Sequence, residues 1–473
     1  MKTECTKKRY QFQALGRREI LADFSGGTIT SDGGGLLLRE VEKRTGILSR
    51  FANCFTDHRN QDLIEHSVVD LVSQRVFGIA LGYEDLNDHD DLSRDQLFAV
   101  MAGKTDPTGE SRLLQRDKGR ALAGKSTLNR LELTPADAGP QDRYKKVVMN
   151  PEAIDALLVD TFIESYPKPP KQIILDVDAT DIPLYGRQEE RFFHGYYDTY
   201  CYLPLYIFCG EELLCARLRP ANIDGAAGTV EELERIITRI RAAWPEVTIV
   251  IRGDSGFCRE SIMAWCEDPE RNIDYLFGLA KNKRLVKEIE TELAEAKVMF
   301  ECSNEPSRRF KDFHYQTLDS WSKPRRVVGK AEQLAGRSNP RFIVTSLSTE
   351  KYDARTLYED EYCARGDMEN RIKEKQLMLF ADRTSSAKMR ANQLRLYFSS
   401  IAYVLMQTLR RIGLSGTTMA RAQCETIRLK LFKIGAQVRI TVRKIWISYA
   451  GGYPYMEIFR QVYRNLQKIP IVV

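Results

Sequence analysis

The sequence predicts a mixed α/β fold: a sheet covered by helices, with a mostly helical region before it and a basic region after it. Between residues 173 and 280, short apolar runs typical of buried strands alternate with an amphipathic helix. Residues 1–150 instead carry apolar side chains at helical spacing. The 473 residues are enough for roughly two to four domains.

Composition excludes several classes of protein. The ten cysteines include no Cys-x-x-Cys pair, which argues against a zinc ribbon and for reduced thiols. No apolar run approaches the ~18 residues that span a bilayer, and residues 1–8 lack the apolar core of a signal peptide. We therefore expect a cytoplasmic protein with no membrane partner.

The positive charge of the chain is concentrated near its end. The net charge is +6, yet residues 401–473 hold twelve Lys or Arg and only two acidic residues. This density suits a polyanion, because each neutralised phosphate releases counterions. The alternative is a solvated surface balanced by acidic residues elsewhere.

Residues 1–146 are predicted to form a mostly helical domain. A Gly-rich turn at residues 30–35 starts a helix over 36–48, and a second helix covers 66–80. The glycines lack the spacing of a phosphate-binding loop. The polar segment 134–146, with prolines at both ends of its first half, indicates a linker.

Two polar features of this domain are candidate sites. The acidic stretch 84–91 is compatible with a metal site, but a loop beside helix caps uses the same residues and the spacing fits no Ca²⁺ loop. A capped helix starting near Ser126 would point Asn129 and Arg130 outward, and both are candidate DNA contacts.

The stretch Ile173–Asp181 organises the predicted sheet. Four apolar residues here surround the carboxylates Asp176, Asp178 and Asp181. A run this apolar predicts a strand buried on both faces, where an unpaired carboxylate costs several kcal/mol. Either a metal ion or an Arg is therefore expected at the strand end. The alternative is a strand that simply ends in an Asp-rich turn.

The elements that follow complete the sheet and then interrupt it. The predicted elements are a hairpin at 202–208 and 213–218, a helix at 228–244, a strand at 247–251, a helix at 259–266 and a strand at 275–280. Residues 284–345 combine a charged helix with alternating segments, which predicts a β-rich insertion with a basic surface. Helical spacing returns at about residue 354 and continues to about 411.

Two further carboxylates have positions that favour a shared site. Asp254 follows a buried strand, as Asp178 does, and two neighbouring parallel strands would deliver both to the same edge of the sheet. Tyr362, Arg365 and Glu369 recur at steps of three and four, so one helix face would carry all three. The alternative for Arg365 and Glu369 is an ordinary surface ion pair.

Taken together, these motifs resemble the DDE-type transposases of bacterial insertion sequences, in the group with a β insertion before the final glutamate. The resemblance spans most of the chain and rests on Asp178-Ala-Thr-Asp181, Arg252-Gly-Asp-Ser-Gly-Phe257 and the Tyr-x-x-Arg-x-x-x-Glu signature that ends at Glu369. It implies a ribonuclease-H-like catalytic domain, with Asp178, Asp254 and Glu369 as catalytic residues and metal ligands. Asp176, Asp178 and Asp181 compete for the first position; Asp178 aligns best, and the other two would support the site from behind the ligands.

The sequence departs from the family signature at one position. The signature has a Lys after six intervening residues beyond the glutamate, and Gln376 stands there. Either Lys373 or Lys375 would take over the implied DNA-phosphate contact, or this subgroup lacks it. Tyr362, Arg365 and Arg252 are the other DNA contacts that the resemblance implies.

The resemblance also implies a mechanism. Two Mg²⁺ ions about 4 Å apart, for which Mn²⁺ can substitute, would be held by a bridging Asp178 with Asp254 and Glu369 on one ion each. The implied activity is cleavage of double-stranded DNA at terminal inverted repeats and joining of the 3′-hydroxyls to target DNA. The implied assembly is a homodimer in a synaptic complex, associated with the bacterial nucleoid.

The predicted organisation has five parts. They are a DNA-end-binding domain at 1–146, the catalytic domain in two pieces at 147–283 and 346–412, the insertion at 284–345 and a basic C-terminal region at 413–473. Three alternatives use the same residues: a nuclease of this fold without strand joining, an inactive DNA-binding repressor, or a glycosidase, against which the basic C-terminal charge counts.

Overall fold

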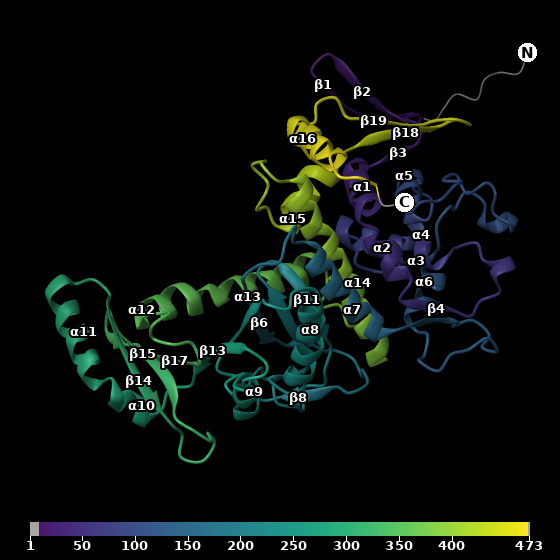
Figure 1. Cartoon of the computed structure of the whole chain (residues 1–473). Helices are drawn as coiled ribbons and strands as arrows, with labels where there is room; N and C mark the ends of the chain where they lie inside the picture. Colours follow the sequence, from purple (N-terminus) through teal and green to yellow (C-terminus); the bar gives the residue numbers. More distant parts are fainter. Residues whose placement is uncertain (1–8, 472–473) are drawn as a thin grey trace, which may run out of the picture. The chain divides into compact units, whose positions relative to one another are not determined.

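The computed structural model describes residues 9–471, and these form two compact units (Figure 1). Residues 1–8, on which the expectation of no signal peptide partly depends, lie outside the described residues. Unit 1 consists of the described residues of Met1–Gly46, Asp62–Asn129 and Thr408–Val473; unit 2 consists of Ile47–Gln61 and Arg130–Gln407. Within residues 9–471, no helix has the length and apolar character needed to cross a membrane.

Unit 2 is built on a large mixed sheet, so the predicted α/β class is confirmed. Its main strand order is β11-β10-β6-β12-β13-β17-β15-β14, with β16 paired to β15. The strands are β6 (Gln172–Ala179), β10 (Leu205–Cys209), β11 (Glu212–Arg217), β12 (Thr248–Gly253), β13 (Ile273–Leu279), β14 (Ser307–Tyr315), β15 (Arg325–Leu334), β16 (Arg337–Ser338) and β17 (Arg341–Thr345). Strand β12 runs parallel to both β6 and β13, and the remaining pairs are antiparallel.

Helices cover both faces of this sheet. On one face, α7 (Pro151–Glu164), α8 (Thr229–Ala243) and α9 (Glu260–Cys266) bury apolar side chains against the central strands. The amphipathic spacing that predicted α8 puts Leu233, Ile236 and Ile240 into this core. The other face packs Val250 and Leu276 against Leu357 and Tyr358 of the segment that carries the predicted glutamate.

The predicted insertion extends the same sheet. Strand β17 pairs antiparallel with β13, and β15 and β14 follow it. Helices α10 (Lys283–Glu288) and α11 (Glu290–Ser303) lie beside these strands (Figure 1). The insertion therefore extends the large sheet of unit 2, with two helices as well as strands.

Unit 1 joins the two ends of the chain. Its helices are α1 (Leu36–Thr45), α3 (Val68–Leu81), α4 (Asp88–Leu92), α5 (Gln96–Met101), most of α6 (Lys125–Glu132), α15 (Cys424–Ile427) and α16 (Met456–Gln467). Strand β3 (Ile29–Thr30) pairs with β18 (Ala436–Ile440), which pairs with β19 (Ile445–Tyr449). The predicted N-terminal domain (1–146) and the predicted basic C-terminal region (413–473) thus contribute strands to one sheet.

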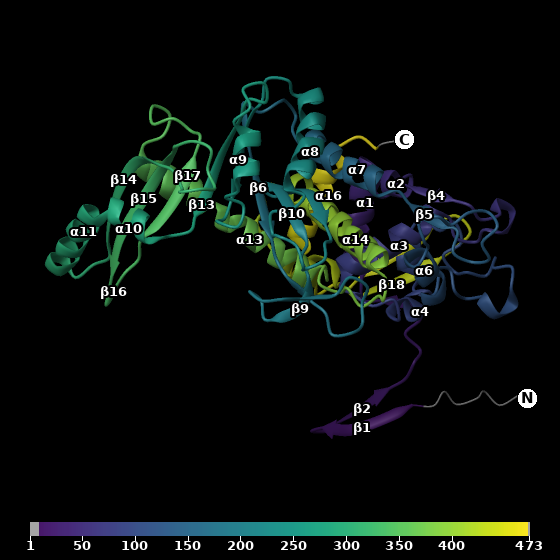
Figure 2. The same ribbon diagram turned by 90° about the horizontal axis from the view of Figure 1, so that it is seen from below.

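Some elements of unit 1 were not expected. The hairpin of β1 (Tyr10–Leu15) and β2 (Arg18–Ala22) is exposed along its whole length and stands apart from the helices of this unit (Figure 2). The acidic stretch 84–91 runs into the short helix α4, whose His89 is buried. The Asp85 amide donates to Asp88 at 3.1 Å and the Asn87 amide donates to Asp85 at 3.0 Å, which are the hydrogen bonds expected of the cap-and-loop alternative.

Most of the remaining elements of unit 2 are short and lie around the large sheet. They are α2 (Ile47–Ala52), β4 (Phe55–Asp57), β5 (Val147–Met149), β7 (Ile182–Pro183), β8 (Phe192–His194), β9 (Thr199–Tyr202) and the long helix α14 (Met389–Thr408). Helix α14 is tied to the sheet by a buried polar group. Tyr397 donates a hydrogen bond to Asp155 of α7 at 2.9 Å, and Arg217 of β11 forms an ion pair with the same carboxylate at 2.5 Å.

Replacing Arg217 by Met should destabilise the protein by about 3–5 kcal/mol, because the Asp155 carboxylate, 1% exposed, would lose its charged partner. The ion pair of Arg239 with Asp160 supplies the control, since Arg239 is exposed and Asp160 is only partly buried. Arg239→Met should cost about 1 kcal/mol or less. Thermal and urea unfolding of the two variants measure the difference. Equal losses of unfolding free energy would contradict the stabilising role given to the Arg217–Asp155 ion pair.

Candidate active site

Strands β6 and β12 deliver the first two predicted carboxylates side by side. Their parallel register pairs Val177 with Gly253, so the next residues, Asp178 near the end of β6 and Asp254 just after β12, occupy matching positions. Both strands are buried and apolar, and this edge is the carboxyl end of each. The predicted parallel placement is therefore confirmed.

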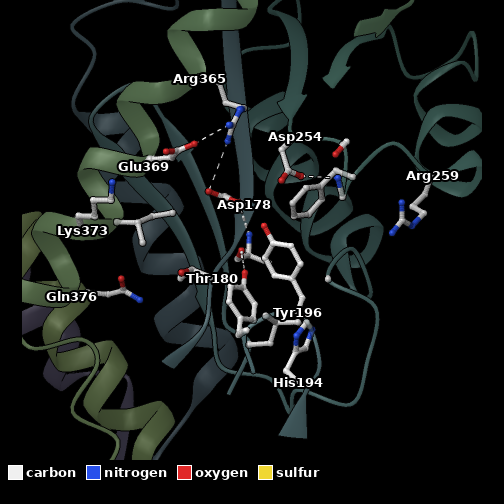
Figure 3. A pocket seen from close by; sticks show the side chains of 18 residues that line it. Asp178, Thr180, His194, Tyr196, Asp254, Arg259, Arg365, Glu369, Lys373 and Gln376 are labelled. Atoms are coloured by element: carbon white, nitrogen blue, oxygen red, sulfur yellow. Dashed lines mark hydrogen bonds and ion pairs between the residues drawn. The ribbon is translucent and has the colours of Figure 1, made fainter. Parts of the chain in front are cut away.

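A cavity of about 580 Å³ opens at this edge (Figure 3). All three predicted catalytic carboxylates, Asp178, Asp254 and Glu369, line it. Arg365 and Lys373 line it as well, and Figure 3 shows them on the helical side with Glu369. The topology thus brings three distant motifs to one hollow.

The turn after β12 fixes the Asp254 side chain. Its Oδ1 accepts a hydrogen bond from the Gly256 amide at 2.7 Å. A Cβ atom on Gly256 would lie only 2.9 Å from that oxygen, so a side chain at this position would displace the Asp254 carboxylate.

Asp176 is satisfied by an arginine rather than by a metal ion. Its two oxygens accept from Arg252 Nε at 2.5 Å and Nη2 at 2.8 Å, and both side chains are buried. A third nitrogen of Arg252 donates to the carbonyl of Glu361. Arg252 is thereby committed to the protein interior in this structure, which corrects its predicted role as a DNA contact and gives it a structural one.

The glutamate lies on an irregular helix. The segment runs through α12 (Ala354–Thr356), the π-helical turn η4 (Leu357–Tyr362), the 3₁₀ turn η5 (Cys363–Arg365), α13 (Gly366–Lys373) and a second π-helical turn, η6 (Glu374–Met378). Such turns interrupt the helical repeat and are frequent at functional sites. As a result Tyr362 does not line the main cavity with Arg365 and Glu369. It lines a neighbouring cavity of about 280 Å³.

Arg365 lies between two of the carboxylates. Its Nη2 is 2.7 Å from Glu369 Oε1, and its Nη1 is 4.0 Å from Asp178 Oδ2 (Figure 3). The described residues contain no group of three acidic, His or Cys side chains assembled closely enough to hold a metal ion. In this arrangement the guanidinium is the cation that the carboxylates share.

The electrostatics of the cavity favour an additional cation. Burial and, to a smaller extent, the neighbouring Asp254 carboxylate together raise the pKa of Asp178 to about 7, with Arg365 acting in the opposite direction. Two adjacent carboxylates cannot both ionise comfortably without positive charge. The donor set consists of hard carboxylate oxygens, which fits a divalent ion such as Mg²⁺. Glu369 could join such a site only after leaving Arg365.

The lysines near the departure from the family signature have different environments. Lys373 is exposed and lines the cavity. Lys375 is fully buried, lies 4.6 Å from the Tyr206 ring centroid, and burial holds its pKa well below the usual range. Its ammonium cannot reach a DNA phosphate in this structure, which corrects that alternative. Gln376 lines the cavity and donates to the Asp181 carbonyl at 3.4 Å.

Three other predicted residues do not line the cavity. Asp181 reaches the site only through that carbonyl, so a supporting role for its carboxylate stays a prediction. Asn129 and Arg130 are exposed on α6, and their contact with DNA also stays a prediction. Arg130 lies over the ring of Tyr144, at 4.7 Å from the centroid.

Sequence reasoning missed several polar and aromatic residues that line the cavity. They are Thr180, His194, Tyr196, Tyr197 and Arg259. The run Arg191-Phe-Phe-His-Gly-Tyr-Tyr197 was the available signal, because so many aromatic residues in a polar stretch favour an interaction surface.

Comparison with known proteins identifies the family. Residues 12–471 match the model of the transposase DDE domain group 1, so the chain belongs to this family and is a DNA transposase. Among solved structures, it is similar to a piggyBac transposase in a synaptic complex with hairpin DNA, with 11% identity and a TM-score of 0.43 over 94% of this chain and 83% of that one. No curated protein matches the chain.

Without divalent ions, the wild-type protein should lose stability as the pH rises through about 7, relative to Asp178→Asn. The folded-state pKa of Asp178 lies above its unfolded value, so the protonated carboxyl stabilises the fold at low pH and this contribution disappears once it ionises. Melting temperatures of both proteins between pH 5 and 8 in EDTA measure the effect.

Asp198→Asn is the control for this measurement, because Asp198 is exposed and outside the cavity. Its melting curve should follow the wild type at every pH. A constant difference between wild type and Asp178→Asn across the range would contradict the assignment.

Proposed function

We propose that this transposase binds the terminal inverted repeats of an insertion sequence, cleaves the element ends and joins the 3′-hydroxyls to target DNA by two-metal-ion phosphoryl transfer. The observation that carries the proposal is the meeting of Asp178, Asp254 and Glu369 at one cavity with Arg365 and Lys373. Carboxylates for metal ions beside cations for phosphate are what such chemistry needs. The order of the central strands supports a ribonuclease-H-like domain.

The carboxylates would hold the divalent ions. Asp178 and Asp254 lie side by side at the ends of adjacent strands and would bind the ions first. Glu369 would bind after its ion pair with Arg365 is broken. When bound, the ions supply activation of the attacking hydroxyl and stabilisation of the leaving oxygen. Mg²⁺, with Mn²⁺ as a substitute, fits this oxygen donor set.

The other residues of the cavity would position DNA. Arg365, once it leaves Glu369, can donate two parallel hydrogen bonds to a phosphate near the scissile bond. Lys373 contributes a point charge from the next turn of the same segment. Tyr362, half-buried beside Arg365, supports the guanidinium from the neighbouring cavity.

Surfaces outside the cavity would bind the flanking duplex. The exposed basic residues of 413–473, such as Arg443 and Lys444, are the strongest candidates. Residues 1–146, with Asn129 and Arg130, are proposed to contact the terminal repeat. The insertion is a weaker candidate than its sequence indicates. Many of its basic side chains form ion pairs with acidic ones within unit 2, among them Arg308, Arg325, Arg326 and Lys330. Two element ends require two active sites, which favours a homodimer.

Asp254→Asn should abolish DNA cleavage and leave DNA binding largely intact, because it removes one metal-binding charge and keeps the side-chain shape. The assay incubates repeat-ended DNA with Mg²⁺ and a second duplex. Asp198→Asn, which neutralises an exposed carboxylate outside the cavity, is the control and should cut normally. Normal cutting by Asp254→Asn would remove this residue from the site.

The same assay separates the alternative functions. Wild-type cleavage without joining to the second duplex would favour a nuclease of this fold. Wild-type binding without cleavage would favour a repressor.

Lys373→Ala should reduce the slope of log affinity against log salt concentration by about one, because one phosphate contact is lost. Lys375→Met should leave that slope unchanged, because the Lys375 ammonium is buried. Binding of one duplex to both variants, measured over a series of salt concentrations, tests this pair. Equal slopes for Lys373→Ala and wild type would exclude Lys373 as a phosphate contact.

A further inference from the structure

A small sheet beside the cavity exposes an unusual number of aromatic rings. We call it the aromatic sheet; it covers residues 182–202 and consists of β7, β9 and β8 in that spatial order. Its inner side buries Cys201 and Tyr202. The exposed aromatic residues are Tyr185, Phe192, Phe193, Tyr196 and Tyr200. Exposed apolar groups gathered in this way mark an interaction surface.

The aromatic sheet and the helical segment that carries Glu369 line different sides of the cavity, and their side chains differ in chemistry. Arg365 and Lys373 line the helical wall, and His194 and Tyr196 lie on the side opposite Arg365 (Figure 3). Asp178 and Asp254 lie between these walls. Arg259 also lines the cavity, away from Arg365 and Lys373 (Figure 3). A cavity that combines cations with aromatic rings matches a molecule with an anionic part and a flat ring.

Contacts within the sheet hold the aromatic wall in place. The Tyr197 hydroxyl donates to the carbonyl of Ala179, the residue after Asp178, at 3.4 Å. The Tyr197 ring packs edge-on against Tyr196 at 5.0 Å and lies 4.9 Å from His194. Tyr196 itself is 85% exposed. Its ring is therefore anchored through a neighbour and still open to a ligand.

We propose that Tyr196 stacks on the base of an unpaired nucleotide next to the scissile phosphate, an inference that rests on the proposed function. A paired base inside a duplex has both faces covered by its neighbours, whereas an unstacked base offers a face to an aromatic side chain. Its phosphate would lie toward the carboxylates and Arg365. The cavity volume of about 580 Å³ lies within the roughly 300–1,000 Å³ typical of sites for small ligands.

Charge distinguishes this contact from ordinary phosphate binding. The aromatic sheet carries two arginines, Arg187 and Arg191, against three acidic residues, Glu189, Glu190 and Asp198. A segment with net negative charge does not attract a duplex backbone. Binding at Tyr196 therefore depends on stacking and should be insensitive to salt.

The test uses the full chain in EDTA, which prevents cutting, and two fluorescein-labelled 12-nucleotide probes. One probe is oligothymidylate, and the other has the same phosphates with abasic sugars in place of the central nucleotides. Tyr196→Ala should weaken oligothymidylate binding about tenfold, in line with the cost of losing one stacked base. It should leave the abasic probe within twofold of wild type and the salt dependence unchanged. Tyr196→Phe should retain the wild-type affinity.

Tyr185→Ala is the matched control, because Tyr185 is exposed in the same sheet but does not line the cavity. It should bind both probes as wild type does. A probe with one 5-iododeoxyuridine should cross-link on irradiation to the peptide that contains Tyr196, and Tyr196→Ala should lose that product.

Three results would overturn the inference: equal weakening of both probes by Tyr196→Ala, an equal effect of Tyr185→Ala, or cross-linking only outside residues 182–202. The proposed function is judged separately, by whether the wild type cleaves and joins repeat-ended DNA with Mg²⁺. If the wild type cleaves and joins DNA but the binding and cross-linking results at Tyr196 are negative, only this inference is overturned.

Discussion

The ion pair between Asp176 and Arg252 is the interaction on which the rest of the active site depends. It joins adjacent parallel strands inside the sheet, and the same guanidinium reaches the carbonyl of Glu361. One buried side chain thus connects all three segments that supply the proposed catalytic carboxylates. Breaking such a pair leaves an uncompensated charge in the interior, so the geometry of the cavity and the stability of the sheet are coupled.

Two arginines, Arg252 and Arg365, each compensate a carboxylate at the site, and they differ in how firmly they are held. Arg252 has both oxygens of one carboxylate and a carbonyl as partners in a buried setting. Arg365 is in close contact with Glu369, whose side chain is far more exposed. Breaking the buried pair of Arg252 would therefore cost more than breaking the partly exposed pair of Arg365.

The large sheet of unit 2 was predictable because its strands are short apolar runs ended by polar residues, as Ile173–Asp181 illustrates. The parallel pairing of β6 with β12 followed from the same pattern. Burial of Lys375 could not be foreseen, because the π-helical turn η6 shifts the helical repeat just there. The aromatic wall escaped prediction for another reason: Tyr196 has no periodic partner, and only the folded chain brings it beside Asp178.

The pairing of β3 with β18 has a consequence for how the protein is made. Residues near the start of the chain find their strand partner only in Ala436–Ile440, and Lys433 supplies the counter-ion of Asp32. During translation, unit 2 has all its residues available long before unit 1 does. A ribosome that stops before Ala436 would release unit 2 together with a unit 1 in which β3 has no strand partner.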